Sequence, residues 1–264
     1  MSTPKLDFFW KNHFDAATVT ANSEDPDFPV ENLQERWATW DWRSAGVAGA
    51  IEIVADLGAE WATKPVLGFV LENMNLTAGA AVEIGGHPTD PTGIGATAYS
   101  TSVAVTAEMI AKKRIAVKLP AEETYRFWRV VIVDAANPDG YVSASRVFFG
   151  EVFRAKYHYK PGGGRDLVDP SSIGQSPAGQ KTSSRQPARD TYSLPVTIAG
   201  LADIDGYDEM ARWCGAYTRP LWVALDSTDI TGSIVYISFM ETIKRPLRTC
   251  LTPWSTTLRL EDEP

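Results

Sequence analysis

The chain has 264 residues, a mass of 28.9 kDa, a formal net charge of −8 and a pI near 5.0. This length is sufficient for two domains, and a hydrophobic content of 44% with 9 Trp is typical of packed cores and argues against a disordered chain. The acidic balance argues against a general nucleic-acid binder, because phosphate neutralisation requires a basic surface.

The only cysteines are Cys214 and Cys250. Two cysteines build neither a disulfide framework nor a four-cysteine zinc site, so we expect buried free thiols, with pairing of the two left open. The first ten residues contain no secretory h-region, and no window approaches 18 uninterrupted apolar residues. We therefore expect neither a signal peptide nor a membrane span.

Taken in chain order, residues 1–31 predict a first strand followed by a loop that contains two prolines. Residues 32–58 read NLQERWATWDWRSAGVAGAIEIVADLG, in which a tryptophan-rich segment precedes an alternating apolar stretch. Alternation places Ile51 and Ile53 on the core side of a strand and Glu52 on the outer side. This stretch predicts entry into a β-domain.

Short strands separated by turns continue to about residue 154, as expected for a β-sandwich. The clearest ones are apolar or alternating, at residues 65–76, 80–85, 115–119, 124–133 and 146–151. The order ENL, W, WRS and IEIVADLG, followed later by TYRFWRVVIV and RVFFGE, resembles a discoidin-like (galactose-binding-like) domain. This resemblance implies a jelly-roll β-sandwich over residues 1–155.

The composition changes at residues 160–190, which are rich in Gly, Pro and Ser and predict an extended arm or connector, placed at 156–190. After it, residues 191–198, 220–226, 233–239 and 254–260 predict strands. Residues 205–217 have helical spacing, with Asp203 or Asp205 as the N-cap. Residues 191–264 are thus expected to form a smaller α+β sandwich with one helix.

The arm, the single helix and the stretch RPLWVALD together resemble tail proteins of long-tailed bacteriophages. This resemblance implies a homo-oligomeric ring at the distal end of the tail tube, located in the virion tail. Its implied partners are tail tube, hub and fibre proteins, together with a host surface glycan. A different class of function is the alternative, namely a carbohydrate-binding module that acts alone or attached to an enzyme.

Catalytic motifs are not supported. The segment GQSPA at 174–178 has Ala178 where a nucleophile elbow needs Gly, and GGGR at 162–165 lacks the ending of a phosphate-binding loop. The histidines are scattered, and the acidic residues near 205 suit the first turn of a helix better than a calcium loop. We therefore expect no enzyme activity, no metal and no cofactor. The histidines are His13, His87 and His158, and the acidic residues are Asp203, Asp205, Asp208 and Glu209.

Two sets of residues are candidates for binding. In the discoidin-like resemblance, loops at one end of the sandwich contact sugars, which implies Trp37, Trp40, Asn73 and Asn75 as contacts, with Trp40 the best candidate for exposure. Packing inside the fold is the competing interpretation for this cluster, above all for Trp42 and Arg43. For oligomer contacts, the helix at 205–217, the strand at 221–225 and the arm are expected to contribute Arg165, Lys181, Arg185, Arg189, Trp213 and Trp222.

Overall fold

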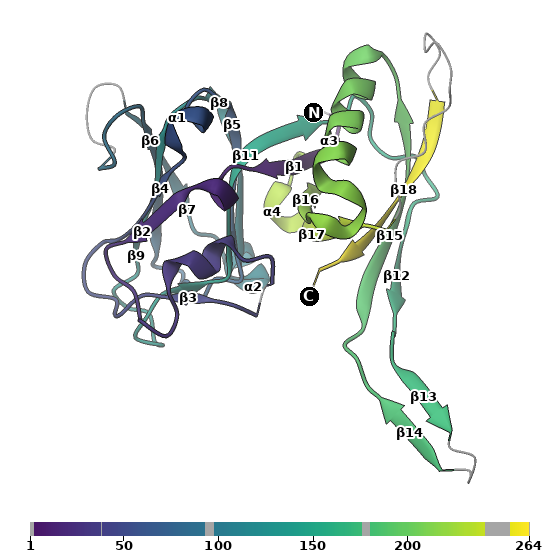
Figure 1. Ribbon diagram of the computed structural model, residues 1–264, viewed down its shortest axis with the longest axis horizontal. Helices are drawn as coiled ribbons and strands as arrows, with labels where there is room; N and C mark the ends of the chain where they lie inside the picture. The colour runs from purple at the N-terminus through teal and green to yellow at the C-terminus, as the bar shows by residue number, and fades with distance from the viewer. Residues whose placement is uncertain (1–2, 38, 93–97, 176–179, 241–253, 264) are drawn as a thin grey trace.

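The computed structural model describes residues 3–37, 39–92, 98–175, 180–240 and 254–263. The protein is mainly β, as predicted, with a β-sandwich, a smaller part that carries one long helix, and a projecting arm (Figure 1). Among the described residues, no helix is long and apolar enough to cross a membrane.

The jelly roll consists of two facing layers. The first is a five-stranded sheet in the order β2-β4-β9-β6-β7, and the second is one end of a nine-stranded sheet, in the order β1-β11-β5-β8. The strands of the first layer are Thr18–Ala21, Ile51–Asp56, Phe127–Val133, Ala81–His87 and Tyr99–Ala104. Those of the second are Asp7–Asn12, Arg146–Arg154, Val66–Glu72 and Arg114–Glu123.

Alternating apolar residues build the core between these layers. In β4 the side chains of Ile51, Ile53 and Ala55 are buried while Glu52 is only partly so, which confirms the predicted alternation. Trp42 and Trp128 are fully buried in the same core. Short elements close the ends of the sandwich, namely η1 (Phe14–Ala16), η2 (Val30–Gln34), β3 (Trp42–Arg43), α1 (Gly58–Trp61), α2 (Ala107–Lys112) and β10 (Ser143–Ala144).

The smaller part forms the other end of the nine-stranded sheet, in the order β12-β15-β18-β17-β16, and β16 pairs with β1 of the jelly roll. Helix α3 (Leu201–Thr218) packs across it, and Tyr207, Met210 and Cys214 are buried on the sheet side. The remaining elements are Gly164–Val168 (β12), Arg189–Ile198 (β15), Leu221–Ala224 (β16), Ile230–Ser233 (α4), Ile234–Phe239 (β17) and Trp254–Asp262 (β18).

Helix α3 begins earlier than predicted, and its N-cap is Gly200 rather than Asp203 or Asp205. Gly200 has φ 92°, a left-handed conformation that favours glycine. The Asp203 carboxylate lies in the first turn and accepts the backbone N–H groups of Ala199 (3.0 Å) and Lys156 (3.1 Å). An acidic first turn is thus confirmed for Asp203, whereas Asp205, Asp208 and Glu209 lie further along the helix.

Strand β1 belongs to both parts of the protein. It pairs with β11 on one side and with β16 on the other, both antiparallel. Phe8 and Trp10 enter the core under α3, whereas Phe9 packs against Phe148 and Trp222 in a separate cluster at the junction. The backbone hydrogen bonds of the two parts therefore form one continuous sheet.

Candidate functional site

The arm is a long β-hairpin that leaves the body at the end of the nine-stranded sheet (Figure 1). Its proximal half pairs β12 with β15, and its distal half pairs β13 (Ser172–Gln175) with β14 (Lys181–Ser184). From residue 164 to residue 175 the arm reaches at most about 40 Å, at roughly 3.3 Å per residue. Residues 160–190, expected to be a polar arm or connector, thus contain paired strands.

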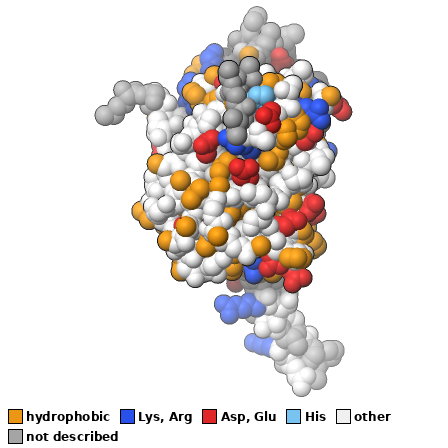
Figure 2. Space-filling model, turned by 90° about the vertical axis from the view of Figure 1, so that its left-hand side faces the viewer, with side chains coloured by type: hydrophobic (Ala, Val, Ile, Leu, Met, Phe, Trp, Pro, Cys, Tyr) orange, Lys and Arg blue, Asp and Glu red, His pale blue; other side chains and the backbone are white. Residues whose placement is uncertain are grey.

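Every residue of β12 is exposed, and Leu167 and Val168 are 73% and 45% exposed. A two-stranded ribbon without a packed face is only marginally stable in water. Figure 2 shows Lys and Arg side chains along the arm, below the body. The arm therefore presents basic and apolar side chains on a ribbon that has little burial of its own.

The ladder between the two halves of the arm is interrupted at Pro170 and Pro187, which have no backbone N–H to donate. The hydroxyl of Ser171 bridges the gap: it accepts the Gln186 N–H at 2.9 Å and donates to the Gln186 carbonyl at 3.3 Å. The interruption divides the arm into a base attached to the sheet and a distal half.

The predicted arm cations fall into two groups. Arg165 pairs with Asp190, and Arg189 pairs with Glu261 at 3.2 Å, so both are ion-paired within the chain. Lys181 and Arg185 belong to the distal half and are exposed, and among the described residues neither has an ion pair. The cations that remain available to a partner are therefore in the distal half.

A cleft of about 440 Å³ lies at the arm base, between α2, β12, β15 and the α4–β17 corner. Its charged lining residues have both signs, and Tyr159 and Tyr192 add aromatic rings. Asp262 is half-buried here and has no ion pair among the described residues. The charged residues are Lys112, Arg114, Arg165, Asp190 and Asp262.

Burial raises the pKa of Asp262 to about 6, against the opposing effect of Arg114, and Asp190 raises it further. Because its folded pKa lies above the unfolded value, this group contributes stability below pH 3.8 that is lost as the pH rises through 6. At neutral pH the ionised carboxylate therefore lowers the free energy of unfolding, and it does so at the arm base.

Asp262→Asn is expected to raise the free energy of unfolding at pH 7.5 by about 1–2 kcal/mol, an amount reduced for partial solvent exposure. The gain should disappear below pH 4, where the wild-type carboxyl is protonated. Denaturant unfolding of both proteins between pH 4 and 8 measures this. Asp166→Asn, on the exposed strand β12, is the matched control and should leave the pH dependence unchanged. An equal gain at every pH would contradict the titration.

The tryptophan loop, residues 35–41, contains the two exposed tryptophans proposed for sugar contact. Trp37 is 46% exposed and Trp40 is 55% exposed, as predicted for Trp40. The backbone N–H of Trp40 donates to the backbone carbonyl of Trp37 at 3.1 Å, and the Arg36 guanidinium lies 4.6 Å from the centre of the Trp37 ring. One side of Trp37 is thus next to a cation, and Trp40 is the more open ring.

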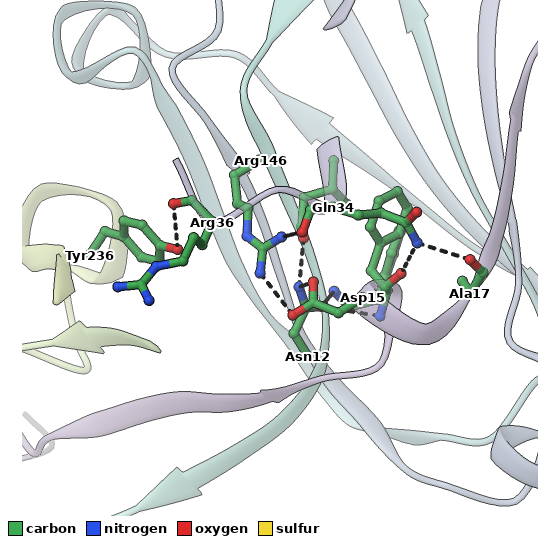
Figure 3. A network of polar contacts seen from close by, with 10 residues as sticks. Asn12, Asp15, Ala17, Gln34, Arg36, Arg146 and Tyr236 are labelled. Atoms are coloured by element: carbon green, nitrogen blue, oxygen red, sulfur yellow. Dashed lines mark hydrogen bonds and ion pairs between the residues drawn. The ribbon is translucent and has the colours of Figure 1, made fainter. Parts of the chain in front are cut away.

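Both parts of the protein hold the loop in place (Figure 3). On the jelly-roll side, Arg146 donates to the Gln34 carbonyl and pairs with Asp15 at 2.8 Å. On the other side, the Tyr236 hydroxyl donates to the Arg36 carbonyl at 3.2 Å, and the Arg36 side chain pairs with Glu263 at 3.2 Å. The loop therefore starts from a fixed position at the junction.

The other proposed sugar contacts have different surroundings. Asn75 donates to the Asp139 carboxylate (2.9 Å) and to the Tyr141 carbonyl (3.0 Å), while its side-chain oxygen accepts the Ser143 N–H (2.8 Å). Its polar atoms thus brace the 139–143 segment, which gives it a structural role. Asn73 is exposed and has φ 53°, at the end of β5. Trp42 is buried, and Arg43 lies over the Phe28 ring, in line with the packing interpretation.

Trp222 and strand β16, which were predicted to contribute oligomer contacts, are buried inside the chain. Strand β16 is buried along its whole length and pairs on both sides, and Trp222 is 1% exposed. The Trp222 indole N–H donates to the Glu72 carboxylate at 3.0 Å, and Glu72 also accepts two hydrogen bonds from Arg114, at 2.6 and 2.7 Å. Sequence reasoning missed this buried junction, because its members are far apart in the chain.

Trp213 is partly buried, and its ring meets Trp10 edge-on at 6.3 Å and lies 4.4 Å from the Arg219 guanidinium. In the described part of the chain, no group of three or more His, Cys, Asp or Glu side chains is arranged to hold a metal ion. Burial raises the pKa of the Cys214 thiol to about 12, and Cys250 lies outside the described residues.

No protein-family model and no curated protein matches the chain. Among solved structures, it is similar to chitosan-binding module 1 of a chitosanase/glucanase from Paenibacillus sp. IK-5, with 18% identity, a TM-score of 0.42, and coverage of 53% of this chain and 99% of that chain. It is also similar to a family 32 carbohydrate-binding module from Clostridium perfringens NanJ in complex with galactose, with 12% identity, a TM-score of 0.40, and coverage of 56% and 99%.

A third similar structure is the module CpGH89CBM32-5 from Clostridium perfringens in complex with GalNAc-β-1,3-galactose, with 13% identity, a TM-score of 0.41, and coverage of 53% and 100%. All three are carbohydrate-binding modules. With identities of 12–18% and TM-scores below 0.5, these likenesses carry no conclusion about the ligand or the partners of this chain.

Proposed function

We propose that this protein is a non-catalytic assembly component of a long-tailed phage tail tip, which forms or decorates a ring at the distal end of the tail tube. The observation that carries the proposal is the arm. It extends up to about 40 Å from the body, exposes Leu167 and Val168, and carries two cations without ion pairs in the described residues. Such a ribbon gains burial only when another surface covers it.

The shape of the protein favours contacts between unlike surfaces of successive copies. The arm is at one end of the nine-stranded sheet and the jelly roll is at the other. An arm that docks on the body of the next copy makes a head-to-tail contact, and repeated contacts of this kind close into a ring if the rotation permits. The jelly roll then stays on the outside, where it is available to other tail proteins or to a host surface.

Shortening the arm is expected to abolish self-association. Residues 169–188 are replaced by Asn-Gly, which joins Val168 to Arg189, two residues that are already paired, through a tight hairpin turn. The body should keep its stability, because the removed residues are exposed wherever their side chains are described, apart from partly buried Pro170 and Ser171. Sedimentation velocity over a concentration series measures the loss, with thermal unfolding as the check on folding. Assembly as strong as in the wild type would refute the role of the arm.

Carbohydrate binding through the tryptophan loop is the second candidate, favoured by the exposure of Trp37 and Trp40. An exposed tryptophan ring presents a flat apolar face on which a sugar ring can stack. Arg36 and Asp41 are the sequence neighbours of Trp37 and Trp40 and supply polar groups beside the two rings. Galactose and GalNAc-β-1,3-galactose, which are bound by two of the similar modules, are the first ligands to test. The two functions are compatible: the arm would assemble the ring, and the tryptophan loop would bind glycan at the outer side of that ring.

If the loop binds glycan, Trp40→Ala is expected to weaken affinity at least about tenfold, because loss of a stacking aromatic removes on the order of 1.4 kcal/mol or more. Titration of each protein with glycan in a calorimeter measures the affinity, and an unchanged midpoint of thermal unfolding would show that the variant keeps its fold. Tyr157→Ala removes another aromatic with 44% exposure and is the matched control. Equal affinity of wild type and Trp40→Ala would remove this residue from the site.

A further inference from the structure

A groove of about 170 Å³ lies between α3 and the strands β1, β5, β8 and β11. Apolar side chains, among them Trp10, Leu67 and Phe153, form part of its lining. All of its charged lining residues are glutamates, namely Glu122, Glu151 and Glu209. The arm-base cleft, in contrast, is lined by three cations and two carboxylates. Of these two hollows, the groove is the one with a single sign of charge.

Internal cations lie close to the groove carboxylates. Lys11 pairs with Glu151 at 3.0 Å and with Glu209 at 3.4 Å, and its ammonium lies 5.1 Å from the centre of the Trp10 ring. The Lys118 ammonium in addition interacts electrostatically with Glu122, so two ammonium groups act on three carboxylates. Glu209 is 63% exposed at its side chain, and Glu122 is exposed, so both can receive further cations without loss of an internal partner.

The distal half of the arm has the complementary chemistry. Lys181 and Arg185 are exposed, and each has a long aliphatic stem that ends in a cation. Such side chains bury their stems on apolar surface while the charged end reaches polar groups. An apolar lining with glutamates matches both properties.

We infer that this groove receives the arm of a second copy of the chain, with Lys181 and Arg185 directed to Glu122 and Glu209. The inference rests on the proposed assembly function and identifies the surface on which the arm docks. Strands β16, β17 and β18 separate the groove from the arm along the sheet. Arm and groove are thus different surfaces, as a head-to-tail contact requires.

Charge reversal tests the pairing in the full-length chain. Glu122→Lys with Glu209→Lys gives a basic groove, and Lys181→Glu with Arg185→Glu gives an acidic arm. Each double variant alone is expected to weaken self-association about tenfold or more, because like charges then meet across the contact. Mixing the two variants should restore assembly, since each arm then finds a groove of opposite charge. Sedimentation velocity measures all three samples, with thermal unfolding as the check on folding.

Glu31→Lys with Glu60→Lys changes the net charge equally at exposed positions away from the groove, and it should assemble like the wild type. If the groove variant also assembles like the wild type while the shortened arm abolishes assembly, the arm docks elsewhere, so the inference fails and the proposed function stands. Failure of the mixture to assemble would also overturn the pairing. A wild-type chain that stays monomeric at every attainable concentration would overturn both.

Discussion

Gly150→Ala is expected to destabilise the protein by roughly 3 kcal/mol or more. Gly150 on β11 faces Asn12 on β1 in the strand pairing. A Cβ atom at this position would lie 1.9 Å from the Lys11 carbonyl oxygen and 2.8 Å from the carbonyl carbon. These are backbone atoms of the paired strand, so relief requires β1 and β11 to separate.

Denaturant unfolding of the purified variant measures the effect. Gly79→Ala is the matched control, because its added Cβ would meet nothing within 4 Å, and its stability should stay within about 0.5 kcal/mol of the wild type. If Gly150→Ala were as stable as Gly79→Ala, the close pairing of β1 with β11 at this position would be wrong.

Glu72→Ala is the second substitution with a large expected effect, about 3–5 kcal/mol. Glu72 is 7% exposed and accepts hydrogen bonds from Arg114 of the jelly roll and from Trp222 of the smaller part. Its removal leaves a guanidinium, only 17% exposed, without its carboxylate and a buried indole N–H without an acceptor. Because both parts contribute donors, the loss should weaken their junction directly.

A double-mutant cycle separates the ion pair from the cost of an unpaired charge. Glu72→Ala combined with Arg114→Ala should destabilise less than the sum of the two single substitutions, because neither charge is then left alone. Glu261→Ala removes the carboxylate of a more exposed pair with Arg189 and should cost about 1 kcal/mol or less. Strict additivity of the two substitutions at the junction would contradict the proposed coupling.

Local patterns were sufficient to predict most strands. Strand β4 follows from the alternation of Ile51 and Ile53, and α3 from the spacing of Tyr207, Met210 and Cys214. The start of α3 was predicted too late, because Gly200 with positive φ replaced the expected acidic cap. Asp262 was missed because β18 was expected to end at residue 260, whereas the strand continues to Asp262. Asp262 is on the same side of the strand as the buried residues Leu258 and Leu260, two residues apart in each case.

The candidate sites were harder to predict, since they depend on pairings between distant residues. Exposure of Trp40 was predicted, but the bonds of Asn75 to the 139–143 segment leave no signal at Asn75 itself. Trp222 lies in an apolar strand, and such a strand is equally compatible with a core and with an oligomer contact. Its burial between β1 and β17 and its hydrogen bond to Glu72, 150 residues away along the chain, place it in the core.

The position of β1 also bears on how the protein is made. Asp7 pairs with Arg154 on one side and with Ala224 on the other. At a synthesis rate of about 5–20 residues per second, roughly 10–40 s pass between the emergence of β1 and that of β16 from the ribosome. During that interval Phe8 and Trp10, which belong to the core under α3, have no finished core to enter. Strand β1 is therefore synthesised well before its partner β16 and stays partly uncovered until β16 emerges, and chaperones that bind exposed apolar segments have time to act on it.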